Sequence, residues 1–159
     1  MLNAAPTGLT LLDTVTVRAL HEGDNAAPRA AILVGGTPTG AVARGAVLEA
    51  ALRWTGGYLL FMTDDVPFED LLSIQLFDRD WRLLDAATLG HAYTTGAFGA
   101  LDIVPPDTVH FHFIGDTRWT LRLLPRPRYC LPVLGDAPGE HRAWRWQRHF
   151  TLAGAPRPG

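Results

Sequence analysis

Two histidines separated by one residue, His110 and His112, form the pattern in this chain that is most typical of metal chemistry. On a β-strand, alternate side chains point to one face about 7 Å apart, so both imidazoles would share a face. Neutral imidazole is a common ligand of zinc and other transition metals, and Asp116 or His149 could complete such a site. A metal-dependent enzyme that uses His110 and His112 is therefore one functional hypothesis.

The His-x-His pair resembles the metal-binding strand of cupins, and the resemblance is confined to these two residues. Val104 stands six residues before His110, where the cupin motif has Gly. Arg118 and Arg122 are expected to project from the same face, where their positive charge repels a metal ion. The simpler interpretation is two exposed histidines opposite Thr120 and Arg122 on a solvated face, and we predict no cofactor.

Charged residues are distributed unevenly along the chain. Residues 1–117 contain six Arg and fourteen Asp or Glu, whereas residues 118–159 contain eight Arg and two acidic residues. The basic part also contains Trp and Tyr residues, and Arg with aromatic side chains is typical of protein interfaces and of surfaces that bind single-stranded nucleic acid or other anions. We therefore expect binding residues among Arg118, Arg122, Arg145 and Trp146.

A structural role explains the same residues. Strand alternation places Trp144 and Trp146 on one face, toward a core, and Arg145 on the other. The arginines would then neutralise the acidic part of their own domain. The net charge is −2, so nucleic acid is the least favoured partner.

No sequence motif for catalysis accompanies these residues. The acidic residues 64–70 lack EF-hand spacing, residues 35–40 lack the Lys of a phosphate-binding loop, and Ser73 lacks a Gly-x-Ser-x-Gly context. Cys130 is the single cysteine, which excludes an intrachain disulfide. We therefore predict a non-enzymatic protein that acts through association, with a protein partner or a second copy, or through small-ligand binding.

The composition is that of a globular protein, with 47% hydrophobic and 19% charged residues. The N-terminal residues lack the basic and apolar segments of a signal peptide, and no apolar stretch approaches the ~18–20 residues of a membrane helix. These observations predict a cytoplasmic protein of bacterial type with no membrane partner. We expect a single β-rich domain over residues 1–159, with frayed ends at about 1–7 and 153–159.

Apolar periodicity predicts strands along most of the chain. A hairpin with Gly56-Gly57 as its turn would pair Trp54 with Leu59. The opposite face of that hairpin carries Tyr58, Leu60 and Met62, so we expect another layer or a partner to cover it. Tyr58 is therefore a further candidate binding residue.

A second hairpin is expected over residues 108–124, where aromatic and polar residues alternate. Matching apolar positions sets Phe113 opposite Trp119 and Phe111 opposite Leu121, which leaves residues 115–117 as a three-residue loop. Residues 143–152 are predicted to form the last strand.

These patterns predict an all-β fold with about nine mostly antiparallel strands, arranged as a sandwich or a flattened barrel. The alternative is an α+β fold with one helix near residues 41–54, because the apolar residues there also fit helical spacing.

Overall fold

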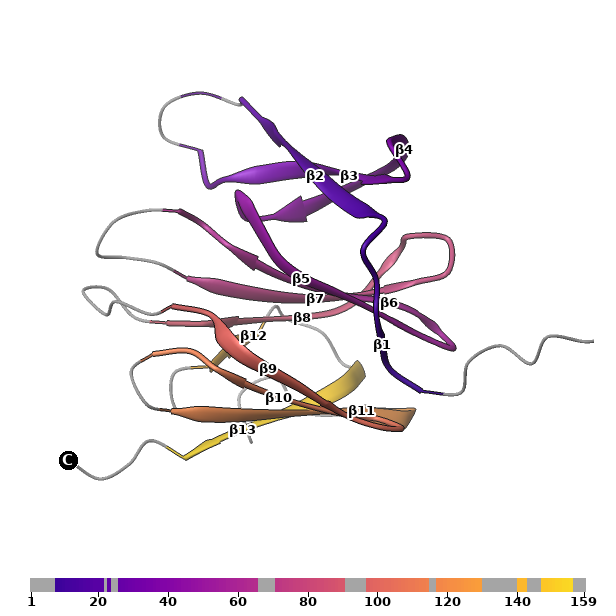
Figure 1. Ribbon diagram of the computed structural model, residues 1–159, viewed down its shortest axis with the longest axis vertical. Coiled ribbons are helices and arrows are strands. Elements are labelled where there is room, and N and C mark those ends of the chain that lie inside the picture. Colours follow the sequence, from indigo (N-terminus) through magenta and orange to yellow (C-terminus); the bar gives the residue numbers. More distant parts are fainter. Residues whose placement is uncertain are drawn as a thin grey trace, which may run out of the picture.

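Every regular element of the described chain is a β-strand, and the strands form three antiparallel sheets (Figure 1). The computed structural model describes residues 8–21, 23, 26–65, 71–90, 97–114, 117–129, 140–142 and 147–155. The all-β prediction is therefore confirmed. The alternative helix near residues 41–54 is wrong, because two strands occupy that range.

The central sheet has six strands, in the order β1-β5-β6-β7-β8-β12. Its strands are β1 (Thr10–Leu11), β5 (Val47–Trp54), β6 (Gly57–Thr63), β7 (Leu72–Asp78), β8 (Leu83–Leu89) and β12 (Glu140–Arg142). Consecutive strands from β5 to β8 are neighbours in this sheet.

Two smaller sheets lie on either side of the central sheet (Figure 1). A three-stranded sheet contains β2 (Val15–Leu20), β3 (Arg29–Val34) and β4 (Thr37–Arg44). A four-stranded sheet, in the order β13-β11-β10-β9, contains β9 (Gly99–Val104), β10 (Thr108–His112), β11 (Arg118–Tyr129) and β13 (Gln147–Ala155).

Each interface between layers contains its own hydrophobic core. Leu59 and Phe61 of β6 pack in one core with Phe111 of β10 and residues of β11 and β13. Leu60 and Met62, which alternate with them along β6, pack in a second core with residues of the three-stranded sheet. The second apolar face of the β5–β6 hairpin is therefore covered by another layer of the same chain.

Several features differ from the expected sandwich or flattened barrel. The strands outnumber the expected nine, and none of the three sheets closes on itself. Strand β9 precedes Pro106, and β4 begins at Thr37, within residues 35–40. The last strand continues to Ala155, past the end expected at Leu152, while residues 143–146 lie outside the described part of the chain.

The β5–β6 turn is shifted by one residue from the expected Gly56-Gly57. Trp54 pairs with Gly57 and Leu52 with Leu59, so Thr55-Gly56 forms the turn. Gly57 has φ 149°, and a Cβ there would overlap the backbone oxygen of Phe77 on β7. The close approach of β7, not the turn, therefore requires glycine at this position.

The β10–β11 hairpin also keeps the expected faces with a shifted register. Phe111 pairs with Trp119 and Val109 with Leu121, so the expected Phe113–Trp119 pair is wrong. The indole Nε1 of Trp119 donates a hydrogen bond to the Phe113 backbone oxygen at 3.0 Å. This bond stabilises the connection between β10 and β11, which is longer than expected and in which Ile114 has a positive φ of 64°.

Candidate functional site

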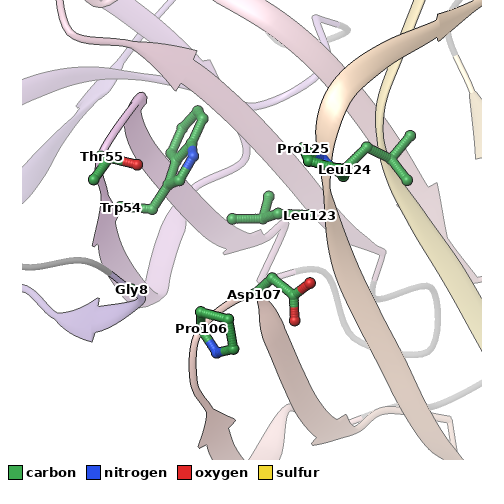
Figure 2. Close-up of a pocket in the computed structure, with 8 residues that line it drawn as sticks. All are labelled: Gly8, Trp54, Thr55, Pro106, Asp107, Leu123, Leu124 and Pro125. Atoms are coloured by element: carbon green, nitrogen blue, oxygen red, sulfur yellow. The ribbon is translucent and has the colours of Figure 1, made fainter.

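A pocket of about 340 Å³ opens where the central sheet meets the four-stranded sheet (Figure 2). Four regions far apart in sequence form it: the segment before β1, the β5–β6 turn, the turn that precedes β10, and the middle of β11. The residues that line it are Gly8, Trp54, Thr55, Pro106, Asp107, Leu123, Leu124 and Pro125.

One wall of the pocket is the half-buried indole of Trp54, at the end of β5. The ring lies so close to Gly56 that a Cβ at Gly56 would overlap it. Glycine in the turn therefore lets the indole fold back beside it. On the facing wall, the buried side chain of Leu123 points toward the indole, whereas the half-buried side chain of Leu124 points away from it (Figure 2).

The turn Pro106-Asp107 supplies the floor of the pocket and its carboxylate. It is fixed by backbone hydrogen bonds from Leu9 N to Pro106 O at 3.3 Å and from Leu123 N to Asp107 O at 2.8 Å. The turn is thereby held against both the segment before β1 and the middle of β11.

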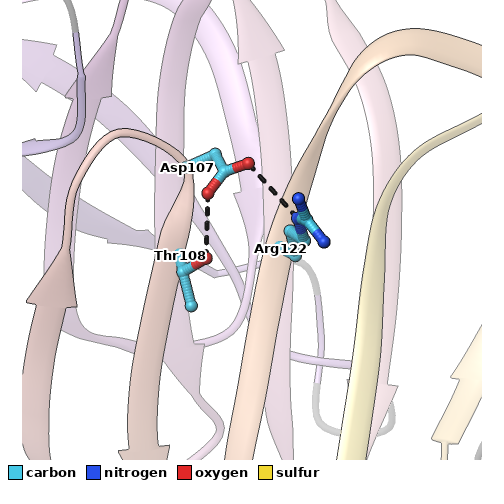
Figure 3. A network of polar contacts seen from close by, with 3 residues as sticks. All are labelled: Asp107, Thr108 and Arg122. Carbon is cyan, nitrogen blue, oxygen red and sulfur yellow. Dashed lines mark hydrogen bonds and ion pairs between the residues drawn. The ribbon is translucent and has the colours of Figure 1, made fainter.

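The Asp107 carboxylate makes two interactions, which Figure 3 shows. Oδ1 accepts a hydrogen bond from the Thr108 hydroxyl at 2.9 Å. Oδ2 lies 3.3 Å from Nε of Arg122, which is exposed. The negative charge in the pocket wall is therefore compensated by a neighbouring guanidinium.

Among the predicted metal ligands, His110 and His112 lie half-buried on the outer face of the four-stranded sheet. His110 Nδ1 and Thr120 Oγ1 share a hydrogen bond at 2.9 Å, and His112 is opposite Arg118. The described residues contain no group of three or more His, Cys, Asp or Glu arranged to hold a metal ion. The metal assignment stays a prediction.

Of the predicted binding residues, Arg118 and Arg122 lie together on β11, next to acidic residues from the first part of the chain. Arg118 is 3.9 Å from Asp102, and Arg122 is 3.3 Å from Asp107. The uneven charge distribution is therefore partly neutralised within one sheet. Arg145 and Trp146 lie outside the described residues.

Tyr58 lies in a different part of the fold. Its ring stacks on Trp81, with 4.0 Å between centroids and 3° between planes, and both residues pack against the core beneath the three-stranded sheet. Arg118 and Arg122 lie beyond the opposite face of the central sheet. The structure therefore does not bring Tyr58 into one site with these arginines.

The pocket residues were not predicted as binding residues. Trp54 was predicted only as a paired residue of the first hairpin, and Pro106 and Asp107 were assigned no role. One signal was present: a tryptophan directly before a Gly-containing turn marks a large aromatic side chain at the end of a sheet, where it is only half covered.

Comparison of the chain with protein-family models, curated proteins and solved structures finds no match. The described residues contain no helix that is long and apolar enough to cross a membrane.

Proposed function

We propose that this protein is a binding protein that holds a small, largely apolar ligand in the pocket beside Trp54. The observation that carries the proposal is the composition of the pocket walls, which combine one indole, two leucines and two prolines with a single carboxylate. Small-molecule sites are typically clefts of about 300–1,000 Å³ with mostly apolar walls and few polar groups.

The walls also support binding rather than catalysis. Asp107 is the single ionisable residue among the described residues that line the pocket, and its carboxylate is engaged by Thr108 and Arg122. These contacts suit a group that orients a ligand. The backbone bonds that fix the Pro106-Asp107 turn keep the pocket formed without ligand, which lowers the entropic cost of binding.

Ligand-detected NMR with a library of small aromatic and aliphatic compounds tests this proposal. Trp54→Ala removes the indole that forms one wall of the pocket and should abolish binding of the compounds that the unmodified protein retains. Trp81→Ala is the matched control, because Trp81 stacks on Tyr58 in the core beneath the three-stranded sheet. Binding that survives Trp54→Ala, or a library without any ligand, would overturn the proposal.

A second candidate function, self-association, is favoured by the last residues of β11. Tyr129 is 74% exposed, and Arg126 and Arg128 beside it are also exposed. Tyr and Arg are enriched in interface hot spots. Sedimentation velocity over a concentration series tests this candidate: Tyr129→Ala should weaken any dimer, and a monomer at every concentration would contradict it.

A further inference from the structure

The pocket differs from a purely apolar cleft in the charges at its rim. Arg126, which is exposed, follows the pocket residue Pro125 in the chain. Arg79 reaches the same rim from the β7–β8 turn, since its Nε donates a hydrogen bond to the Thr55 backbone oxygen at 2.8 Å.

Arg122 adds a further guanidinium, through its contact with Asp107. That contact uses Nε, so the two terminal nitrogens of Arg122 are not part of it. An arginine that pairs through one nitrogen can still donate to a second anion, because its five N–H groups lie in one plane.

Acidic residues near the rim offset these charges in part. Asp107 is paired with Arg122. Asp78, next to Arg79 in sequence, accepts hydrogen bonds through Oδ1 from the backbone N–H groups of Asp80 and Arg82. The Asp78 carboxylate is thereby turned toward its own hairpin, while Asp80 is exposed.

From this arrangement we propose that the ligand is an amphipathic anion, with an apolar body against Trp54 and Leu123 and a carboxylate at the rim near Arg122. The inference rests on the proposed function of the pocket. Charge complementarity supports it, because Arg79 and Arg122 both contact residues of the lining, and the single acidic residue of that lining is already paired. An ammonium group would meet these same guanidinium groups and be repelled.

A matched ligand series tests the preference for an anion separately from the ability of the pocket to bind a ligand. Naphthaleneacetate, naphthaleneacetamide and naphthylethylamine share one apolar body and carry a negative, neutral and positive end group. Titration in low-salt buffer at neutral pH should show the carboxylate binding about two- to five-fold more tightly than the amide, the scale of an exposed ion pair. The amine should bind most weakly, and added salt should reduce the differences.

Two substitutions at the ion pair should act in opposite directions. Arg122→Gln removes a guanidinium and should weaken carboxylate binding without changing amide binding. Asp107→Asn removes the competing anion and should strengthen carboxylate binding. Arg18→Gln makes the same charge change at an exposed site on β2, in the three-stranded sheet, and should change neither affinity.

The outcomes are distinguishable. Equal binding of all three compounds, or tighter binding of the amine, overturns the anion inference while the pocket function stands. Binding of none of them, together with a library screen that finds no compound sensitive to Trp54→Ala, overturns both. The expected order of affinities, with opposite responses to Arg122→Gln and Asp107→Asn, supports the inference.

Discussion

The buried carboxylate of Asp85 on β8 accepts a hydrogen bond from the backbone N–H of His149 on β13, with 2.8 Å between Oδ2 and N. Its other oxygen accepts one from the backbone N–H of Ala86, also at 2.8 Å. Asp85 has no solvent exposure. One side chain therefore links the central sheet to the four-stranded sheet inside the molecule.

Removal of this carboxylate should destabilise the fold. Asp85→Ala leaves the N–H groups of Ala86 and His149 without their acceptor, and we expect a loss of about 3 kcal/mol in the free energy of unfolding. Asp85→Asn keeps one acceptor oxygen and should lose less. Urea denaturation followed by Trp fluorescence measures both, and an unchanged midpoint for Asp85→Ala would show that the link contributes nothing.

Glycine substitutions should separate backbone strain from steric overlap. At Gly36, φ is 82° and a Cβ would meet no atom within 4 Å, so Gly36→Ala should cost about 1–2 kcal/mol from backbone strain alone. At Gly57, the Cβ would also overlap the backbone of β7, so Gly57→Ala should cost roughly 3 kcal/mol or more. Thermal unfolding of the two variants compares them, and equal losses would contradict the close approach of β7.

The side chain of Gln75 on β7 is expected to hold the edge of the three-stranded sheet. Its Oε1 accepts from Arg44 N and its Nε2 donates to Arg44 O, each at 2.9 Å. Gln75→Ala removes both bonds and should cost about 2 kcal/mol. Hydrogen exchange should then speed up in β4 while β10 stays protected; uniform loss of protection would indicate global unfolding and contradict a local role.

The histidine pair gives a fourth prediction. Because His110 is engaged by Thr120 and His112 lies opposite Arg118, we expect added Zn²⁺ to leave the thermal midpoint unchanged. His110→Ala should cost about 1 kcal/mol through the lost hydrogen bond, with or without a chelator. Stoichiometric zinc in elemental analysis, lost in His110→Ala, would instead establish the metal site.

Sequence periodicity predicted which side chains face inward better than it predicted which residues pair. Leu59 and Phe61 share a core with Phe111, as alternation requires. Both hairpin registers were nevertheless wrong, by a shift of two residues, which leaves Leu52, Leu59 and Phe111 facing the same core. Alternation has a period of two, so it cannot distinguish registers that differ by two residues.

The two Gly-Gly pairs show why turn chemistry alone could not place both turns correctly. Gly35 and Gly36 both have positive φ, 56° and 82°, and join β3 to β4 as a two-residue turn. The same reasoning applied to Gly56-Gly57 failed, because Gly57 is needed for its contact with β7. That contact depends on a strand that follows in sequence, and local propensity carries no information about it.

The pocket could not be predicted for a related reason. Trp54, Asp107 and Leu124 come from three separate elements, and only the packing of two sheets brings them together. Their residue types are ordinary for strand ends and turns. The charge distribution did point to β11, although it gave no indication that Arg122 would pair with Asp107.

The central sheet, which is apolar on both faces, has a consequence for biosynthesis. Strands β2 to β4 precede the central strands and can cover one face early, whereas β9 to β13 emerge from the ribosome last. Until they do, the face that carries Leu59, Phe61 and Ile74 has no apolar partner. A nascent chain paused before β9 therefore exposes an apolar sheet surface, which chaperones can shield from aggregation.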